Sequence, residues 1–246
     1  MNAIVVLIKL IAAHLVGDFL FQTDGLCEAK RSADIRKRLS AQIVHALTQA
    51  VTAYLFVAQW DNWVVPTVIG ASHFIIDNIK NACKDSSLSA FITDQLAHIL
   101  VIVVLWWFDF FKEPANMALV HYGLSIKAWL ILTAYISVLS PASILIKAFM
   151  EYEKWIPADA SAQGMPNAGK WIGYLERVLI LTFIFTNNIE GIGFLLAAKS
   201  VFRFGELNKS KDVKTTEYVL IGTLASFAIA ILIGFGVIEL WQMALE

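Results

Sequence analysis

The sequence has few charges, few cysteines and no large excess of either charge sign. Lys, Arg, Asp and Glu make up 16% of the 246 residues, against about a quarter in an average soluble domain. The net charge is −1, and we expect no nucleic-acid partner. Cys27 and Cys83 both fall in connections that we place in the cytoplasm below, so we expect free thiols and no disulfide.

Several enzyme signatures are also missing. The sequence contains no HExxH metalloprotease motif, no Walker loop, no rhomboid-type GxSxG motif and no glycine-rich dinucleotide fingerprint. These absences leave the usual peptidase and nucleotide-binding classes without support.

Apolar side chains are abundant and make up 58% of the chain. A transmembrane helix needs about 20 predominantly apolar residues, and a soluble chain of this length has too much surface to bury so many. The composition therefore predicts an all-α fold, a polytopic transmembrane helical bundle of about eight helices. The expected segments are 3–21, 40–57, 63–79, 90–111, 124–150, 171–186, 191–204 and 217–240.

Basic residues fall mostly on one set of the connections between these segments. If every segment crosses, this set holds 16 of the 19 Lys and Arg residues. The positive-inside rule then places this set in the cytoplasm and both termini outside. We expect the first segment to be a retained helix rather than a signal peptide, in a bacterial cytoplasmic (inner) membrane.

The polar residues within the segments change in kind along the chain. Residues 1–112 are expected to form a four-helix membrane subregion that bears His and Asp, and residues 113–246 to be companion membrane helices of the same domain. Pro141 predicts a kink in the fifth segment. The segment 191–204 is about 21 Å long as a helix, so it either crosses or forms a re-entrant hairpin with the segment before it.

Histidine and aspartate recur four residues apart in the first half of the chain, a spacing that puts both on one face of a helix. The stretch "AHLVGDFLFQ" predicts a stripe of His14, Asp18 and Gln22, and the same spacing recurs in "HFIIDNIK" and, in reverse order, in "DQLAH". In antiparallel helices this reversal brings the side chains to similar depth, near the cytoplasmic face. The residues concerned, with one more histidine in the second segment, are His14, Asp18, His45, His73, Asp77, Asp94 and His98.

Imidazole and carboxylate together are the ligand set of a divalent metal ion, Zn first and Mn, Fe or Ni otherwise. All seven residues are candidate ligands, although one ion cannot bind them all, and two ions or one ion plus a base both remain open. Asp18, Asp77 and Asp94 are also candidate catalytic residues, as general base or as partners of a ligating imidazole. Lys80 lies near Asp77 and either steadies an anionic oxygen or extends to the inner surface.

A second, weaker candidate site lies in the later segments. Arg177, Lys199 and Arg203 fall near the predicted inner surface and either bind an anion, such as a lipid headgroup, or simply anchor the helices there.

These motifs resemble those of an uncharacterised bacterial membrane-protein family, a domain of unknown function. The resemblance rests on "HLVGDFLFQT", a lysine about a dozen residues later (Lys30 is nearest), a histidine in the second segment, "HFIIDNIK" and "DQLAH", over about the first 110 residues. A more distant similarity to small membrane-bound metal-dependent hydrolases lacks their His-Arg and His-Ser motifs. The resemblance implies a membrane location, and by analogy metal-dependent hydrolysis.

Taken together, these features predict a metal-dependent hydrolase with a cytoplasm-facing His/Asp centre. Its substrate is expected to be membrane-associated, with a phosphoester or anionic lipid favoured by the nearby basic residues. Two alternatives stay open: a metal-ion or proton transporter or channel, and a membrane sensor that uses the polar cluster as a structural latch. The lipid bilayer is the expected partner, and oligomerisation is left open.

Overall fold

The computed structural model describes residues 3–83, 87–111, 124–155, 167–207 and 213–243, and every element among them is a helix. The all-α prediction is therefore confirmed. The helices are α1 (Ala3–Phe19), α2 (Asp24–Lys30), α3 (Ile35–Val57), α4 (Val64–Cys83), α5 (Leu88–Trp106), the π-helical turn η1 (Trp107–Phe111), α6 (Ile126–Val138), α7 (Ser140–Tyr152), α8 (Ala168–Phe185), α9 (Glu190–Leu207) and α10 (Val213–Met243).

The chain divides into two compact units, an N-terminal unit of residues 1–133 and a C-terminal unit of residues 134–246. The division falls within α6. The subregion boundary expected between residues 112 and 113 lies outside the described residues.

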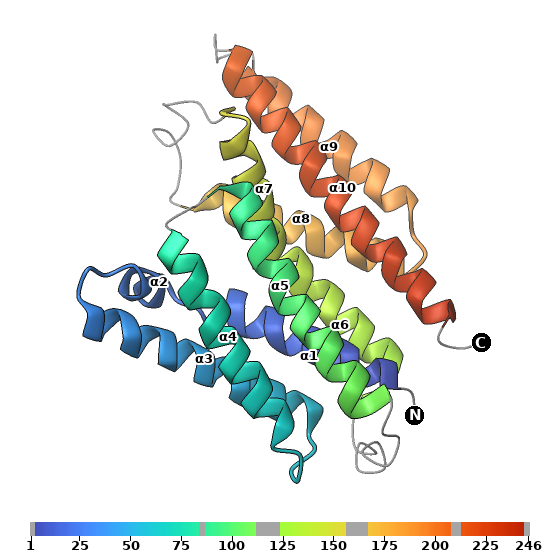
Figure 1. The fold of residues 1–246 in the computed structure, drawn as a ribbon. Helices are drawn as coiled ribbons and strands as arrows, with labels where there is room; N and C mark the ends of the chain where they lie inside the picture. The colour runs from blue at the N-terminus through green and yellow to red at the C-terminus, as the bar shows by residue number, and fades with distance from the viewer. Residues whose placement is uncertain (1–2, 84–86, 112–123, 156–166, 208–212, 244–246) are drawn as a thin grey trace. The chain divides into compact units, whose positions relative to one another are not determined.

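Four helices of the N-terminal unit form a closed ring. α3 packs against both α1 and α4, and α5 completes the ring by packing against the same two helices (Figure 1). One end of the ring interior is apolar, with Val6, Leu10, Val57, Val65 and Phe110 in its core. Burial of these side chains holds the four helices in a fixed register.

Polar side chains cap the first turn of three helices in the N-terminal unit. Thr23 accepts from the Leu26 amide at the start of α2, Asp34 from Arg36 at α3, and Ser87 from Ala90 at α5. The helix α2 was not anticipated from its polar sequence. It follows α1 at an angle of 82° and brings Lys30 to the ring, against α3.

The C-terminal unit packs α10 against α7 and α8, with α9 beside α8. Its core includes Val138, Ile180, Leu181, Ile184 and Phe227. The segment in which Pro141 predicts a kink is broken next to this proline: α6 ends at Val138, and α7 begins at Ser140 with the proline in its first turn.

Three helical stretches are long and apolar enough to cross a membrane, which indicates a membrane protein. They are Leu88–Phe110, Ile126–Tyr152 and Thr216–Met243, and the bent pair α1 and α2 makes a fourth if it counts as one span. Eight crossings remain a prediction, because within the described ranges the other helices do not meet this standard of length, hydropathy and charge.

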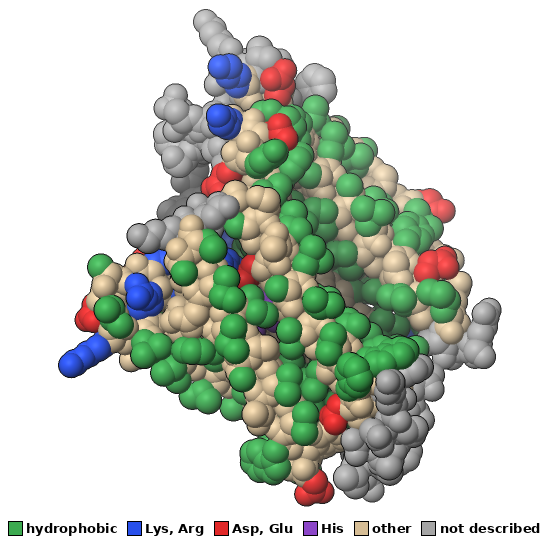
Figure 2. Space-filling view, in the orientation of Figure 1, with side chains coloured by type: hydrophobic (Ala, Val, Ile, Leu, Met, Phe, Trp, Pro, Cys, Tyr) green, Lys and Arg blue, Asp and Glu red, His purple; other side chains and the backbone are tan. Residues whose placement is uncertain are grey.

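The outward faces of the ring helices are apolar. Leu47 and Leu55 on α3, Ile79 on α4, and Leu96 and Leu100 on α5 are each more than half exposed. Hydrophobic side chains cover α4 and α5 on the face seen in Figure 2, while basic ones gather near α2 and the start of α3. An apolar surface of this extent suits contact with lipid rather than with water.

Candidate metal centre

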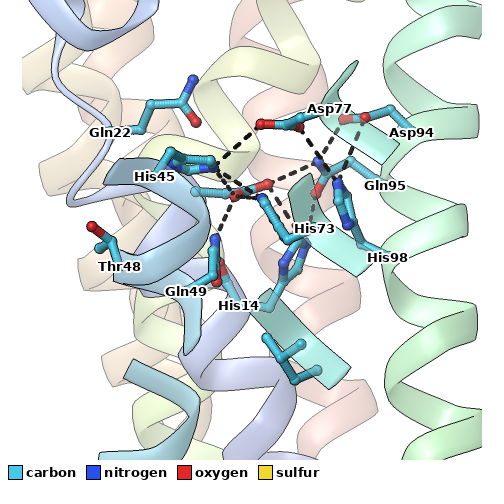
Figure 3. A network of polar contacts seen from close by, with 12 residues as sticks. His14, Gln22, His45, Thr48, Gln49, His73, Asp77, Asp94, Gln95 and His98 are labelled. Atoms are coloured by element: carbon cyan, nitrogen blue, oxygen red, sulfur yellow. Dashed lines mark hydrogen bonds and ion pairs between the residues drawn. The ribbon is translucent and has the colours of Figure 1, made fainter. Parts of the chain in front are cut away.

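Each of the four ring helices contributes one histidine to the interior of the ring. His14 lies on α1, His45 on α3, His73 on α4 and His98 on α5, and none is more than 4% exposed. The aspartates one turn away on α1, α4 and α5 are nearly as buried. The structure thus brings together all seven residues that the sequence proposes as ligands (Figure 3), in three overlapping groups whose ligand atoms lie within 4.8 Å of one another.

Three of these atoms form a tight triangle. His45 Nε2 lies 2.9 Å from His73 Nε2, and both nitrogens lie 3.1 Å from Asp18 Oδ1. Each Nε2 carries at most one hydrogen, so with an ionised aspartate at least one edge of the triangle has no hydrogen to share. Zinc bonds of about 2.0–2.1 Å separate tetrahedral ligand atoms by about 3.3 Å. The triangle therefore fits one divalent ion better than it fits three hydrogen bonds.

The other two aspartates each divide their oxygens between a lysine and His98. Asp77 Oδ2 lies 2.5 Å from Lys30 Nζ, and Asp94 Oδ2 lies 2.6 Å from Lys80 Nζ. Their Oδ1 atoms face His98 Nε2, at 3.8 Å from Asp77 and 3.6 Å from Asp94, too far for hydrogen bonds. Asp94 Oδ1 and His98 Nε2 consequently have no hydrogen-bond partner among the described residues.

Two glutamine side chains donate to the carboxylates, and one of them, Gln95, connects two carboxylates. Gln49, one turn beyond His45 on α3, donates from Nε2 to Asp18 Oδ1. Gln95 donates from Nε2 to Asp18 Oδ2 and to Asp94 Oδ2, both at 3.2 Å, and its Oε1 lies 3.3 Å from His14 Nε2. These amides orient the aspartates in the way that outer partners of a metal site orient its ligands.

Sequence reasoning did not assign Gln49, Gln95 or Lys30 to the site. The spacing of four residues from His45 to Gln49 and the place of Gln95 inside "DQLAH" were the available signals. Lys30 entered the sequence analysis only as part of the family resemblance, and no local signal indicated its contact with Asp77, which lies 47 residues away.

Gly17 explains part of the "HLVGDF" pattern. A Cβ atom at this position would lie 2.5 Å from the Gln49 side chain. Glycine therefore lets α3 approach α1 closely enough for Gln49 to reach Asp18.

The prediction that Gln22 extends the stripe of His14 and Asp18 is wrong. α1 ends at Phe19, and the Gln22 amide donates to Cys27 Sγ at 3.1 Å. The chain turns there toward α2, so position 22 no longer lies on the helix face that carries the stripe (Figure 3).

The cluster carries a net negative charge in its simplest protonation state. The carboxylates of Asp18, Asp77 and Asp94 outnumber the ammonium groups of Lys30 and Lys80 by one when the four imidazoles are neutral. A buried excess of negative charge is costly unless a cation neutralises it.

The weaker candidate site in the C-terminal unit is engaged in other contacts. Arg177 donates to the carbonyl oxygens of Val138 and Leu139 and to two serine hydroxyls. Lys199 Nζ lies 2.6 Å from Glu176 Oε2. Arg203 lies on α9, with its side chain outside the described part of the structure.

Fold and site together define an all-helical membrane protein whose N-terminal unit encloses a His/Asp cluster able to hold metal. The sequence model of one family, described as a protein of unknown function (DUF3307), matches residues 6–145, and the chain belongs to this family. The matched range includes all seven candidate ligands. No curated protein and no solved structure matches the chain.

Proposed function

We propose that the protein is a metal-dependent hydrolase of the bacterial cytoplasmic membrane, acting from the cytoplasmic side on a membrane-associated phosphoester. The observation that carries the proposal is the convergence of Asp18, His45 and His73, from three different helices, on one point. Imidazole and carboxylate ligands favour Zn²⁺, with Mn, Fe or Ni as alternatives. Such an ion would act as a Lewis acid on a substrate oxygen and supply a nucleophile at neutral pH.

The remaining groups of the cluster have distinct tasks under this proposal. Gln49 and Gln95 hold the Asp18 carboxylate in place by hydrogen bonds to its two oxygens. If the centre holds a single ion, Asp94 is the candidate general base, because its Oδ1 accepts no hydrogen bond from the described residues. Lys80 is the most accessible charged group, with its side chain 38% exposed, and suits contact with an anionic substrate oxygen.

A layer of apolar side chains favours an enzyme over a channel. A small cavity beside His14, His73 and His98 has apolar lining residues, which are Leu10, Ile69, Ile102 and Ala53. The first three of these are each one turn from one of the histidines and at most 6% exposed. A transport path would need polar groups or water beyond this layer. The cluster therefore suits a site that is open on one side only.

The first experiment is metal analysis of the detergent-purified protein by inductively coupled plasma mass spectrometry, followed by assay on phospholipid in mixed micelles. We expect bound Zn, Mn, Fe or Ni and hydrolysis, both lost in His45→Ala and both retained in Thr48→Ala. Thr48 is a matched control because it lies on the same helix but is only partly buried, and its hydroxyl donates to the Val44 carbonyl.

Absence of metal above background, after reconstitution with each ion in turn, would overturn the metal centre. Metal binding without hydrolysis of any phosphoester would overturn the enzyme and favour the sensor with a structural latch.

A further inference from the structure

The triangle of Asp18, His45 and His73 does not account for two buried polar atoms elsewhere in the cluster. Asp94 Oδ1 and His98 Nε2 are buried polar atoms with no hydrogen-bond partner in the described residues. Asp94 is 6% and His98 3% exposed, so water does not satisfy them from outside. A buried polar atom left unpaired is costly, and two of them 3.6 Å apart need a common explanation.

A hydrogen bond is not that explanation. The Asp94 to His98 separation of 3.6 Å and the Asp77 to His98 separation of 3.8 Å exceed hydrogen-bond length. Ligand atoms around one ion with bonds of about 2.1 Å stand about 3.0–3.6 Å apart, according to the coordination number. Small adjustments of the two carboxylates would bring Asp77, Asp94 and His98 to this spacing.

The two lysines set the orientation of these carboxylates. Lys30 and Lys80 each hold the Oδ2 atom of one aspartate, which turns both Oδ1 atoms toward His98. Asp77 also faces the first triangle, since its Oδ2 lies 3.8 Å from His45 Nε2. Asp77 thus belongs to both sets of possible ligands.

From this arrangement we infer that Asp77, Asp94 and His98 form a second divalent-cation site, joined to the first through Asp77. The inference rests on the metal centre of the proposed function. The first site has two imidazoles and one carboxylate, whereas the second has two carboxylates and one imidazole. Carboxylate-rich sites suit Mn²⁺, so the two sites differ in the ion they favour. Pairs of ions at adjoining sites are common in enzymes that cleave phosphoesters.

The test is reconstitution of the metal-free protein with Mn²⁺ alone, read by metal content and by electron paramagnetic resonance. We expect about two equivalents per chain and a spectrum of two exchange-coupled ions. Asp94→Asn, which keeps the shape of the side chain, is expected to bind one equivalent with the six-line spectrum of an isolated ion. Thr48→Ala is expected to match the wild type.

The outcomes separate this inference from the proposed function. One equivalent in the wild type, unchanged in Asp94→Asn and lost in His45→Ala, would overturn the second site and leave the first. Two uncoupled Mn²⁺ ions that both remain bound in Asp94→Asn would also overturn the second site. If the wild type binds no Mn²⁺, both sites are overturned. If Asp94→Asn does not fold, the number of ions and their coupling in the wild type decide the question.

Discussion

Lys30 and Lys80 make similar ion pairs in very different surroundings. The Lys30 side chain is 8% exposed and that of Lys80 is 38% exposed, while both lie within 2.6 Å of a buried carboxylate. Removing one partner of a buried pair leaves the other charge unpaired in a poor solvent, whereas an exposed lysine is readily replaced by water. The two ion pairs have similar lengths, but we expect them to contribute unequally to the free energy of unfolding.

We expect Lys30→Met to lower the free energy of unfolding by about 3–5 kcal/mol and Lys80→Met by about 1 kcal/mol or less. The measurement is denaturation of the detergent-solubilised protein in the presence of a chelator, so that no added ion replaces the lost charge. Equal losses in the two variants would show that burial does not set the strength of these pairs.

Much of the site could be predicted from residue spacing alone. The recurrence of His and Asp at four residues, reversed in the fourth segment, is enough to bring His14, His73 and His98 to one depth in antiparallel helices. The pairing of Lys30 with Asp77 could not be predicted, because it depends on the direction in which the chain turns after α1. The bridging contacts of Gln95 likewise depend on the closure of the ring, which no local pattern encodes.

At the break between α6 and α7, backbone carbonyl oxygens accept hydrogen bonds from a side chain of another helix. Pro141 has no backbone N–H to donate, so the helical ladder is interrupted beside the carbonyl oxygens of Val138 and Leu139, although the Leu139 oxygen still accepts from the Ser143 amide. Arg177 of α8 donates to both of them and also to Ser143 and Ser226. A planar guanidinium satisfies several acceptors at once, which an ammonium group does not do in the same geometry.

Arg177→Lys is therefore expected to destabilise the protein by at least about 2 kcal/mol, a fall in melting temperature of about 4–8 °C. The matched control is Lys147→Met, since Lys147 is 71% exposed and its contact with Glu151 is 3.6 Å long. We expect the control to shift stability by about 0.5 kcal/mol or less. Thermal unfolding followed by circular dichroism measures both. An unchanged melting temperature in Arg177→Lys would mean that water or lipid headgroups satisfy the break.

Helix positions were easier to predict than helix ends. Each of the eight apolar segments corresponds to a described helix or, for 124–150, to the broken pair α6 and α7. The short helix α2 escaped prediction because its seven residues have no apolar periodicity, and its start depends on the Thr23 cap. The length of an apolar segment predicts where a helix lies in the membrane. The residues at which a helix begins and ends depend on single hydrogen bonds, such as those of caps.

At the scale of the whole molecule, the predicted topology can be tested with the two native cysteines. Cys83 is exposed at the end of α4, in a segment expected to face the cytoplasm, and Cys27→Ser leaves it as the only thiol. We expect a membrane-impermeant maleimide to label Cys83 only after the cells are permeabilised. Asp61→Cys in a Cys27→Ser, Cys83→Ser background places a thiol in the exposed turn between α3 and α4 and is expected to be labelled in intact cells. The reverse pattern would invert the orientation of the chain.

The closed ring has a consequence for how the protein is made. His14 meets its partner Gln95 across 81 positions of sequence, and the last helix that supplies ligands is α5. Until α5 has been synthesised and inserted, Asp18 and Asp77 face lipid or each other without their full set of partners, which is costly. Insertion of α5 therefore completes the set of polar contacts inside the ring. A chain that ends before α5 would therefore leave the buried Asp18 and Asp77 carboxylates without the Gln95 and His98 side chains that face them in the complete ring.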